Sequence, residues 1–358
     1  MLVLDQESRF RIRGTKRLNS RGIAVIAGVV QSLDSVQRYE MEHRPARGKR
    51  TYSYASLIMM CMFIEMRHLT YDGDIAQNML MAMGMPRDDD GYQRPSPARV
   101  SDFINNEWPE MEQDVSREYR AAVLRMLPQK IFTVDSTPMD ANNYSRKYDF
   151  SPHYCKNMGK CHILMCCGYP LCRTFTNAND FDGSEFPKLL VQLEETVSGY
   201  VEMMTDGAYA SFQNYAAAFQ RFGVVMASNP RSGSVYHDES SWEKLKDLYS
   251  HHWKEPSYRV RPKNDWMLKY LIAKGGNDME HAGAFLRNLD MRRGHRIARG
   301  YALKRHVCET VHRSIKRWLR FDVRGLRRES EEQRKSFRFF CAQILCTVFD
   351  PYYSPESE

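Results

Sequence analysis

The chain has 358 residues, of which 42% are hydrophobic and 27% are charged. This length and composition allow a sizeable buried core and about two domains, and they exclude a disordered chain. The longest apolar stretch, Leu57 to Ile64, is too short to cross a bilayer, and residues 1–13 lack the apolar core of a secretory signal. We therefore expect a soluble, cytoplasmic protein without a membrane partner.

The formal net charge of +8 is unevenly distributed. Residues 285–340 contain 17 Lys or Arg and 6 Asp or Glu, a local excess of +11, which leaves −3 for the rest of the chain. A basic block of this kind favours a polyanionic partner, because each neutralised phosphate releases condensed counterions. The alternative is an ordinary solvated helical face.

Helices are predicted for the first part of the chain, because apolar residues recur there at spacings of three and four. These helices are Ile23 to Leu33, Tyr54 to Arg67, Tyr71 to Met83, Pro97 to Asn105 and Met111 to Leu127. A basic linker, His43 to Arg50, and an acidic loop, Asp88 to Gly91, interrupt the helical pattern. We expect a helical N-terminal domain over residues 1–128.

A second domain is predicted from Lys130 onward, where short β-type runs alternate with helical segments. The predicted strands are Ile131 to Val134, Cys161 to Cys167, Leu171 to Phe175, Val201 to Thr205 and Gly223 to Ala227. The predicted helices are Phe186 to Val197, Ala210 to Phe222, Gly300 to Leu319 and Ser336 to Val348. Gly168-Tyr169-Pro170 is typical of a hairpin turn. This pattern predicts a mixed α/β sheet flanked by helices.

We place this domain at residues 129–348, with an insertion at about 232–284 and a tail at 349–358. Trp242, Trp253 and Trp266 lie in the insertion. Tryptophans can stack on an unpaired or flipped base, and core packing is the simpler alternative.

Nine cysteines, most of them between Cys155 and Cys172, lack the repeated C-x-x-C pairs of a structural zinc site. Reduced thiols are the simpler interpretation. A metal site that includes His153 and His162 is the alternative.

Two aspartates, Asp135 and Asp206, stand directly after predicted buried strands. In an α/β sheet, ligands bind outside the carboxyl ends of the strands, so these two side chains are candidates for a site. The alternative is that each one only caps a turn or a helix start. Asp180 and Asp182 follow the hairpin, a position that favours a role in the loop.

The helix predicted over Gly300 to Leu319 presents Glu309 among cations. At about 100° per residue, four residues lie within about 60° of Glu309: Arg305, His312, Arg313 and Lys316. An apolar stripe faces the opposite way: Leu303, Val307, Val311 and Trp318. We expect this helix to pack its apolar side on the core. The alternative is that Glu309 only forms i,i+4 ion pairs with Arg305 and Arg313.

Three carboxylates in a basic environment fit the cleavage and transfer of a phosphodiester. That reaction needs an activated water or 3′-hydroxyl and a stabilised leaving oxygen, which two Mg²⁺ ions about 3.5 to 4 Å apart supply. Hard cations prefer oxygen ligands, and Mg²⁺ retains waters and substrate phosphate in its other positions. Asp135, Asp206 and Glu309 are therefore candidate ligands of two Mg²⁺ or Mn²⁺ ions.

The sequence resembles the DDE transposases of prokaryotic insertion sequences. Thr133 to Thr137 resembles the first motif of that family, and Met204 to Tyr209 resembles the second. Between them, Lys160-x-His162, Gly168-x-Pro170 and Asn179-Asp180 are similar to the hairpin and loop of the family. The resemblance implies an RNase H-like catalytic domain, and an N-terminal helical domain that recognises the terminal repeats of a mobile element.

The third motif resembles the Tyr-x2-Arg-x3-Glu-x6-Lys signature of the cut-and-paste group that makes hairpin DNA ends. Arg305, Glu309 and Lys316 fit its spacing. Tyr301 is one residue too far from Arg305, because Lys304 occupies the position expected for the arginine. This departure leaves open whether cleavage uses a hairpin intermediate.

The resemblance implies that three residues bind metal and catalyse: Asp135, Asp206 and Glu309. We expect six residues to contact DNA: Tyr301, Lys304, Arg305, His312, Arg313 and Lys316. The predicted function is a transposase that cleaves the ends of its own element and joins them to target DNA, acting on chromosomal or plasmid DNA. Its partners are double-stranded DNA, as terminal inverted repeats and target, and a second subunit in the DNA-bound state. The alternatives are a domesticated DNA-binding relative without cleavage and a structure-specific nuclease of the same fold.

Overall fold

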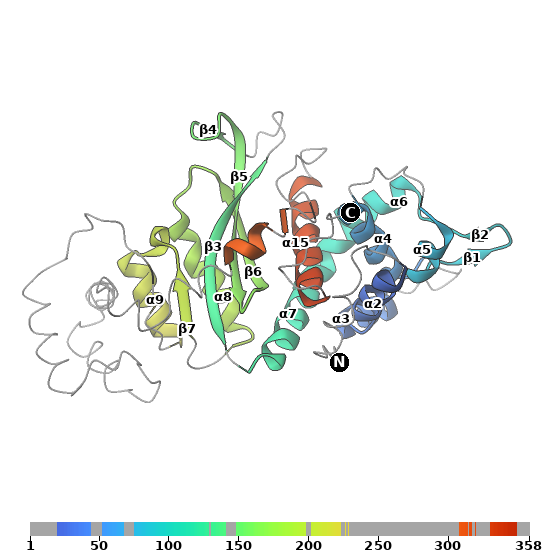
Figure 1. Ribbon diagram of the computed structural model, residues 1–358, viewed down its shortest axis with the longest axis horizontal. Coiled ribbons are helices and arrows are strands. Elements are labelled where there is room, and N and C mark those ends of the chain that lie inside the picture. The colour runs from blue at the N-terminus through green and yellow to red at the C-terminus, as the bar shows by residue number, and fades with distance from the viewer. Residues whose placement is uncertain are drawn as a thin grey trace, which may run out of the picture.

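The computed structural model places a β-sheet beside a group of N-terminal helices, with the C-terminal helix between them (Figure 1). It describes residues 20–43, 52–67, 75–128, 130–140, 148–197, 202–222, 308–313 and 330–348, with isolated positions 226, 228, 315, 316 and 319. The predicted insertion and tail, and most of the predicted strand Gly223 to Ala227, lie outside these residues. Among the described helices, none combines the length and apolar composition that a membrane span requires.

The N-terminal part is helical, as its apolar spacing predicts. The first helices are α2 (Ser20–Gln31), α3 (Asp34–Glu42), α4 (Tyr54–Arg67) and α5 (Gln77–Ala82). Helix α4 has the predicted bounds, whereas α3 was not predicted, because most of its residues are polar. The Glu118 carboxylate accepts hydrogen bonds from the backbone N–H groups of Asp34 and Ser35, both at 2.8 Å. These two N–H groups belong to the first turn of α3 and have no partner within the helix, so a residue far away in the sequence provides their hydrogen-bond acceptor.

A small hairpin and a long helical segment follow. The hairpin pairs β1 (Arg87–Asp88) with β2 (Gly91–Tyr92) around the predicted acidic loop. The segment runs through α6 (Pro97–Asp102), the π-helical turn η1 (Phe103–Glu107) and α7 (Trp108–Met126). The Ser96 hydroxyl accepts a hydrogen bond from the backbone N–H of Arg99 and caps α6, with Pro97 in the first turn.

The sheet contains β3 (Ile131–Asp140), β4 (Phe150–Ser151), β5 (Lys156–Cys166), β6 (Tyr169–Asn177) and β7 (Glu202–Thr205). The order across the sheet is β6, β5, β3, β7, and β4 pairs with the outer end of β5. Strands β3 and β6 are each antiparallel to β5, which lies between them, and β7 is parallel to β3. Three antiparallel strands with the fourth parallel to the first on its other side form an RNase H-like sheet. The predicted fold class is confirmed.

Strand β3 is longer than predicted. Pattern alone ends it before Asp135, but pairing with β5 continues as far as Asp140 opposite Met158. The turn between β5 and β6 is at Cys167 and Gly168, both with positive φ, rather than at Gly168-Tyr169-Pro170. A two-residue turn with two positive φ values matches the twist of the flanking strands.

The helices that come after β6 in the chain pack against the sheet and against one another. Helix α8 (Phe186–Glu194) packs on β6 and on α9 (Phe212–Phe222), and the short helical turns η2 (Asp182–Glu185) and η3 (Gly207–Tyr209) contact each other. The amide side chain of Gln192 donates to the carbonyl of Arg173 at 2.9 Å and accepts from its N–H at 3.2 Å. These two bonds pair the N–H and carbonyl groups that Arg173 presents at the outer edge of β6, so another strand cannot pair with β6 at this residue.

Helix α15 (Ser330–Val348) joins the two parts of the molecule. It contacts α2, α4, η1 and α7 on one side and β6 on the other. The Tyr119 hydroxyl donates to the carbonyl of Gln343 at 2.8 Å, and the Gln343 amide donates to the carbonyl of Leu171 at 3.2 Å. Buried apolar residues of the N-terminal helices, the sheet and α15 form one continuous cluster. The predicted domain boundary at residue 128 lies between α7 and β3 and stays a prediction.

A buried ionic group fixes α15 to α4. Glu65 is 4% exposed and accepts hydrogen bonds from Nε of Arg334 at 2.6 Å and Nε of Arg338 at 2.7 Å. Such a carboxylate is costly to remove, because two guanidinium charges lose the negative charge that faces them in a water-poor environment.

We expect Glu65→Ala to lower the free energy of unfolding by about 3 to 5 kcal/mol, measured by urea denaturation. Asp114→Ala is the matched control, since its ion pair with Arg38 is exposed and its loss costs less than about 1 kcal/mol. Equal losses in the two variants would contradict a central role for the buried group.

Candidate active site

The two aspartates that follow strands lie next to each other in the sheet. In the parallel pairing of β3 with β7, the last paired residues are Val134 and Thr205. Asp135 and Asp206 are the next residue on each strand, so their backbones leave the paired segment at the same edge. Both side chains are partly exposed. The register therefore brings together two carboxylates that are separated by seventy residues of sequence.

Each carboxylate also contacts the backbone N–H of the next residue. Oδ1 of Asp135 accepts from the backbone N–H of Ser136 at 2.9 Å, and Oδ1 of Asp206 accepts from that of Gly207 at 2.7 Å. The capping role considered from sequence is thus present for Asp206, which caps the helical turn Gly207–Tyr209, whereas Asp135 lies within β3. Each carboxylate has a second oxygen as well, so these hydrogen bonds are compatible with ligand binding.

A helical segment, residues 308–313, lies across the face of β3 and is drawn in orange in Figure 1. Its Cys308, Val311 and His312 are buried, whereas Glu309 and Arg313 are exposed. Nδ1 of His312 is 3.6 Å from Oδ2 of Asp135. This contact brings the helix of Glu309 to the strand of Asp135.

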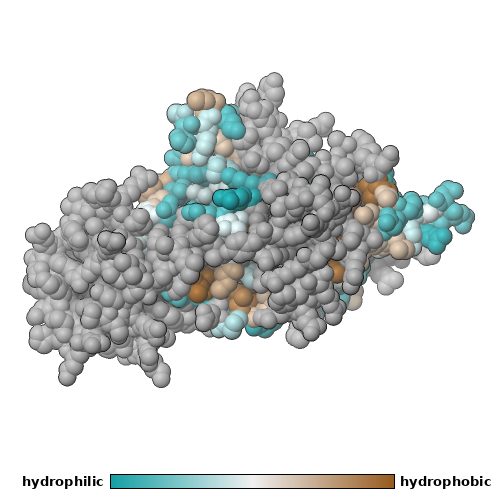
Figure 2. Space-filling model, viewed as in Figure 1, coloured by the Kyte–Doolittle hydropathy of each residue, from teal (hydrophilic) through white to brown (hydrophobic). Residues whose placement is uncertain are grey.

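The predicted two-sided character of this helix is observed in part. Val311 is buried as expected. On the described surface, hydrophilic residues gather around the upper and middle part of the sheet, and hydrophobic residues lie below them (Figure 2). His312 was expected on the DNA-facing side with Arg313, and it is instead 7% exposed and turned toward Asp135. Lys316 is partly exposed. Six residues used in the prediction lie outside the described part of the chain: Tyr301, Leu303, Lys304, Arg305, Val307 and Trp318.

The donor set fits a divalent cation by its chemistry. Asp135 and Asp206 offer carboxylate oxygens at one sheet edge, and an exposed Glu309 lies on the neighbouring helix. Within the described residues, no three His, Cys, Asp or Glu side chains are close enough together to hold a metal ion. The cation ligands stay a prediction that the strand register supports.

A polar network occupies the opposite face of the sheet. Ser136 is directly across from His162, and Asp135 is across from Ile163. Because successive side chains of a strand alternate, Ser136 and His162 share one face and Asp135 points to the other. The His162 ring hydrogen-bonds the Tyr209 hydroxyl through Nδ1 at 3.0 Å.

The network continues to the loop after β6. Nε2 of His162 is 2.8 Å from the Thr176 hydroxyl. The Ser136 hydroxyl donates to Oδ2 of Asp182 at 2.9 Å, and Lys160 forms an ion pair with the same carboxylate. Asp182 thus has the loop role favoured from sequence. Sequence analysis missed the network, although polar residues at alternate positions of the apolar strand β5 were a usable signal.

Burial sets the protonation of the two central groups. It raises the pKa of Tyr209 well above its ordinary value, and the charges of Asp182 and Asp135 act in the same direction. It lowers the pKa of His162, where Lys160 adds to the effect and Asp182 opposes it. At neutral pH, a protonated phenol therefore meets an uncharged imidazole.

All nine cysteines are free. Cys161 and His162 are neighbours on β5, so their side chains point to opposite faces of the sheet. Burial raises the pKa of Cys161 to about 12, which keeps the thiol protonated. Both ring nitrogens of His162 are hydrogen-bonded to hydroxyl groups, which disfavours the alternative of a metal site that includes His153 and His162.

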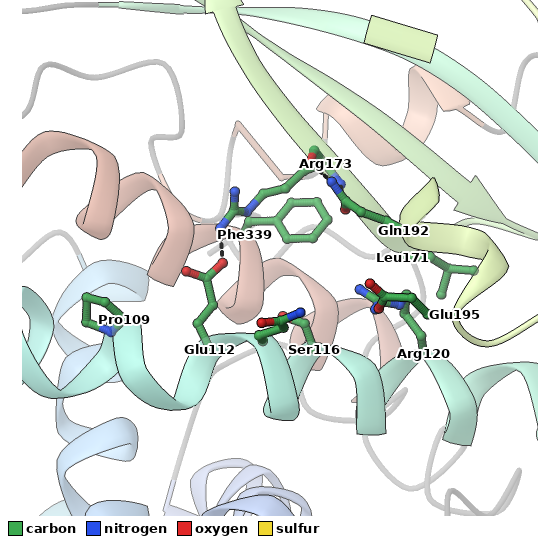
Figure 3. Close-up of a pocket in the computed structure, with 10 residues that line it drawn as sticks. Pro109, Glu112, Ser116, Arg120, Leu171, Arg173, Gln192, Glu195 and Phe339 are labelled. Atoms are coloured by element: carbon green, nitrogen blue, oxygen red, sulfur yellow. Dashed lines mark hydrogen bonds and ion pairs between the residues drawn. The ribbon is translucent and has the colours of Figure 1, made fainter. Parts of the chain in front are cut away.

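A pocket of about 310 Å³ lies apart from the aspartates, between α7, β6, α8 and α15 (Figure 3). Ion pairs cross it from α7, one between Arg173 and Glu112 and one between Arg120 and Glu195 at 2.5 Å. The charges that line the pocket thus compensate each other. They join α7 to the sheet and to α8.

Comparison with known proteins identifies the family to which the chain belongs. A family model described as a transposase DDE domain matches residues 127–345, well over half of the chain. The chain belongs to this family of DDE transposases. Proteins of this family act in DNA transposition and use divalent metal ions.

Among solved structures, a cryo-EM piggyBac transposase synaptic complex with hairpin DNA is similar. It has 9% sequence identity and a TM-score of 0.34, over 91% of this chain and 80% of that chain. This likeness is too remote to inform the site. The search of the curated proteins found no match.

The lowered pKa of His162 predicts a pH-dependent stability. The folded state disfavours the proton, so the contribution of neutral His162 is present above its unfolded pKa of about 6.5 and is lost as the pH falls below it. We expect the free energy of unfolding to fall between about pH 7 and pH 5, by at most about 1.4 kcal/mol per pH unit for this one proton.

Urea denaturation of His162→Gln should show a smaller slope over this range. Lys160, Asp180, Asp182 and Glu185 surround the ring and stay in place in the variant. The exposed His153 provides the control, since His153→Gln should keep the slope of the unchanged protein. An unchanged slope in His162→Gln would refute the assignment.

Proposed function

We propose that this protein is a cut-and-paste transposase that cleaves DNA at the ends of its own element and joins them to a target. The observation that supports this most directly is the parallel register of β3 and β7, in which Asp135 and Asp206 follow the paired residues Val134 and Thr205. Membership of the DDE transposase family supplies the class of reaction.

In this proposal Asp135, Asp206 and Glu309 hold two Mg²⁺ or Mn²⁺ ions. When bound, such ions activate the attacking water or 3′-hydroxyl and stabilise the leaving oxygen of the phosphodiester. The backbone N–H groups of Ser136 and Gly207 hold one oxygen of each aspartate and thereby orient both carboxylates. The exposed Arg313 and the partly exposed Lys316 attract the DNA phosphates.

Finer parts of the proposal depend on the sequence. Residues 1–128 form the part that recognises the terminal inverted repeats, and two subunits bring the two ends together. Arg305, Glu309 and Lys316 match the signature of the insertion-sequence group that makes hairpin ends, while Lys304 stands in the place of its arginine. Tyr301 and Lys304 are further candidate DNA contacts.

The central test replaces each proposed ligand by its amide. We expect Asp135→Asn, Asp206→Asn and Glu309→Gln each to lower DNA cleavage by about a thousandfold or more, because each loses part of the cation charge stabilisation. Binding to end-sequence DNA should change little. Cleavage is measured on a labelled duplex that carries the element's end.

Asp180→Asn is the matched control, since Asp180 is an exposed acid in the loop after β6 and the amide keeps an oxygen for the N–H of Asn177. Full cleavage by Asp135→Asn would refute the proposal. Cleavage without joining to a target plasmid would instead favour a structure-specific nuclease. DNA binding without cleavage in the unchanged protein would favour a domesticated DNA-binding relative.

The cations of the helix should contribute to affinity through phosphates. We expect Arg313→Ala and Lys316→Ala each to reduce the slope of log K against log salt by about 1, similarly for all DNA sequences. Fluorescence anisotropy over a salt series measures this slope. An unchanged slope in both variants would place the DNA elsewhere. Lys188→Ala is the control, because Lys188 is an exposed cation on α8, outside the proposed DNA-contacting residues.

A further inference from the structure

We propose that Tyr209 and His162 are positioning residues that fix the turn after Asp206 against the sheet and so set the spacing of the two aspartates for a divalent cation. This inference rests on the proposed function. It concerns the face of the sheet opposite Asp135, to which neither the family match nor the motif analysis assigns a role.

The turn after β7 is held at both ends. At its start, Oδ1 of Asp206 accepts from the N–H of Gly207, and the carbonyl of Asp206 accepts from the N–H of Tyr209 at 3.0 Å. At its end, the amide of Asn214 donates to the carbonyl of Tyr209 at 3.0 Å and to that of Gly183 at 2.9 Å. The main chain of residues 206–209 therefore moves as one unit.

The side chain of Tyr209 connects this unit to the sheet. Its ring is fully buried, and its hydroxyl is 3.0 Å from Nδ1 of His162 on β5, whose Nε2 is 2.8 Å from the hydroxyl of Thr176 on β6. The η3 turn is thus hydrogen-bonded to two strands that lie beyond β3. A shift of Asp206 relative to the sheet would break this chain of bonds.

The other aspartate is held by a parallel arrangement. The N–H of Ser136 binds Asp135, and the Ser136 hydroxyl donates to Asp182, which is paired with Lys160 of β5. Both aspartates are therefore fixed to β5, one through Ser136 and one through Tyr209. Strand β5 acts as a common reference for their separation.

Packing alone does not require this polar network. Buried hydrogen-bonded groups add little net stability compared with apolar groups of similar shape, but they select one arrangement because any other leaves polar atoms unsatisfied. Two carboxylates that share a cation need such a fixed arrangement. Residues that orient metal ligands typically contribute 10- to 100-fold to metal affinity.

Tyr209→Phe removes the hydroxyl and keeps the ring. With Mn²⁺ as the probe, we expect about a tenfold higher Kd for the full chain by electron paramagnetic resonance, and a matching shift in the Mn²⁺ concentration needed for cleavage. Cleavage at saturating Mn²⁺ and affinity for end DNA should stay within about twofold of the unchanged protein.

Tyr215→Phe is the matched control. Tyr215 is equally buried, on helix α9, and its hydroxyl bonds Ser228 instead of His162. A general loss of stability would affect both variants alike, whereas positioning affects only Tyr209→Phe. His162→Gln is the second variant if Tyr209→Phe does not fold, and the same rise in Kd is expected.

The outcomes separate the two proposals. An unchanged Kd for Mn²⁺ in Tyr209→Phe, or equal changes in Tyr209→Phe and Tyr215→Phe, would overturn the positioning role and leave the proposed function intact. Absence of Mn²⁺ binding by the unchanged protein, or unaltered binding by Asp135→Asn, would overturn the proposed function and with it this inference.

Discussion

The parallel pairing of β3 with β7 is the constraint on which the site depends. It ends at Val134 and Thr205, and the next residue on each strand is an aspartate. A shift of one residue would turn one carboxylate to the other face of the sheet, because side chains alternate along a strand. The apolar residues Phe132 and Met203, both 0% exposed, resist such a shift, since it would move buried side chains out of the core. The buried residues of β3 and β7 thus fix the distance between Asp135 and Asp206, which follow the last paired residues.

Helix α15 fixes the position of the N-terminal helices relative to the sheet. It binds the edge strand β6 through Gln343 and the helix α4 through the buried Glu65, so the position of one part follows from that of the other. The aromatic residues Trp108 and Phe337 meet at 5.1 Å between ring centroids in the same seam. Under the proposed function, in which the N-terminal helices recognise DNA and the sheet carries the cleavage site, a rigid connection keeps the cleaved bond at a fixed distance from the recognised sequence.

The elements with strong local patterns were predictable from sequence. Helix α4 has the predicted bounds, and the strand before Asp206 ends at Thr205 as expected. Features that depend on long-range pairing were not predictable in the same way. Strand β3 continues past Asp135 only because β5 pairs with it, and α3 is polar enough that its helical pattern is weak. His312 lies on the Glu309 side by helical rotation, yet it turns to Asp135, because the angle at which a helix meets a sheet is decided by packing.

The two faces of β3 have different chemistry, and the strand itself joins them. Asp135 points to the face with the helix of Glu309, and Ser136 points to the face with His162 and Tyr209. Asp135 and Ser136 are joined by one planar, stiff peptide unit. The N–H of Ser136 also binds the Asp135 carboxylate, so fixing the position of Ser136 also fixes that carboxylate. A polar network can therefore orient a carboxylate without sharing its face. Under the proposed function, the face with the helix of Glu309 carries charge for the substrate, while the opposite face carries the hydrogen bonds that keep the carboxylates in place.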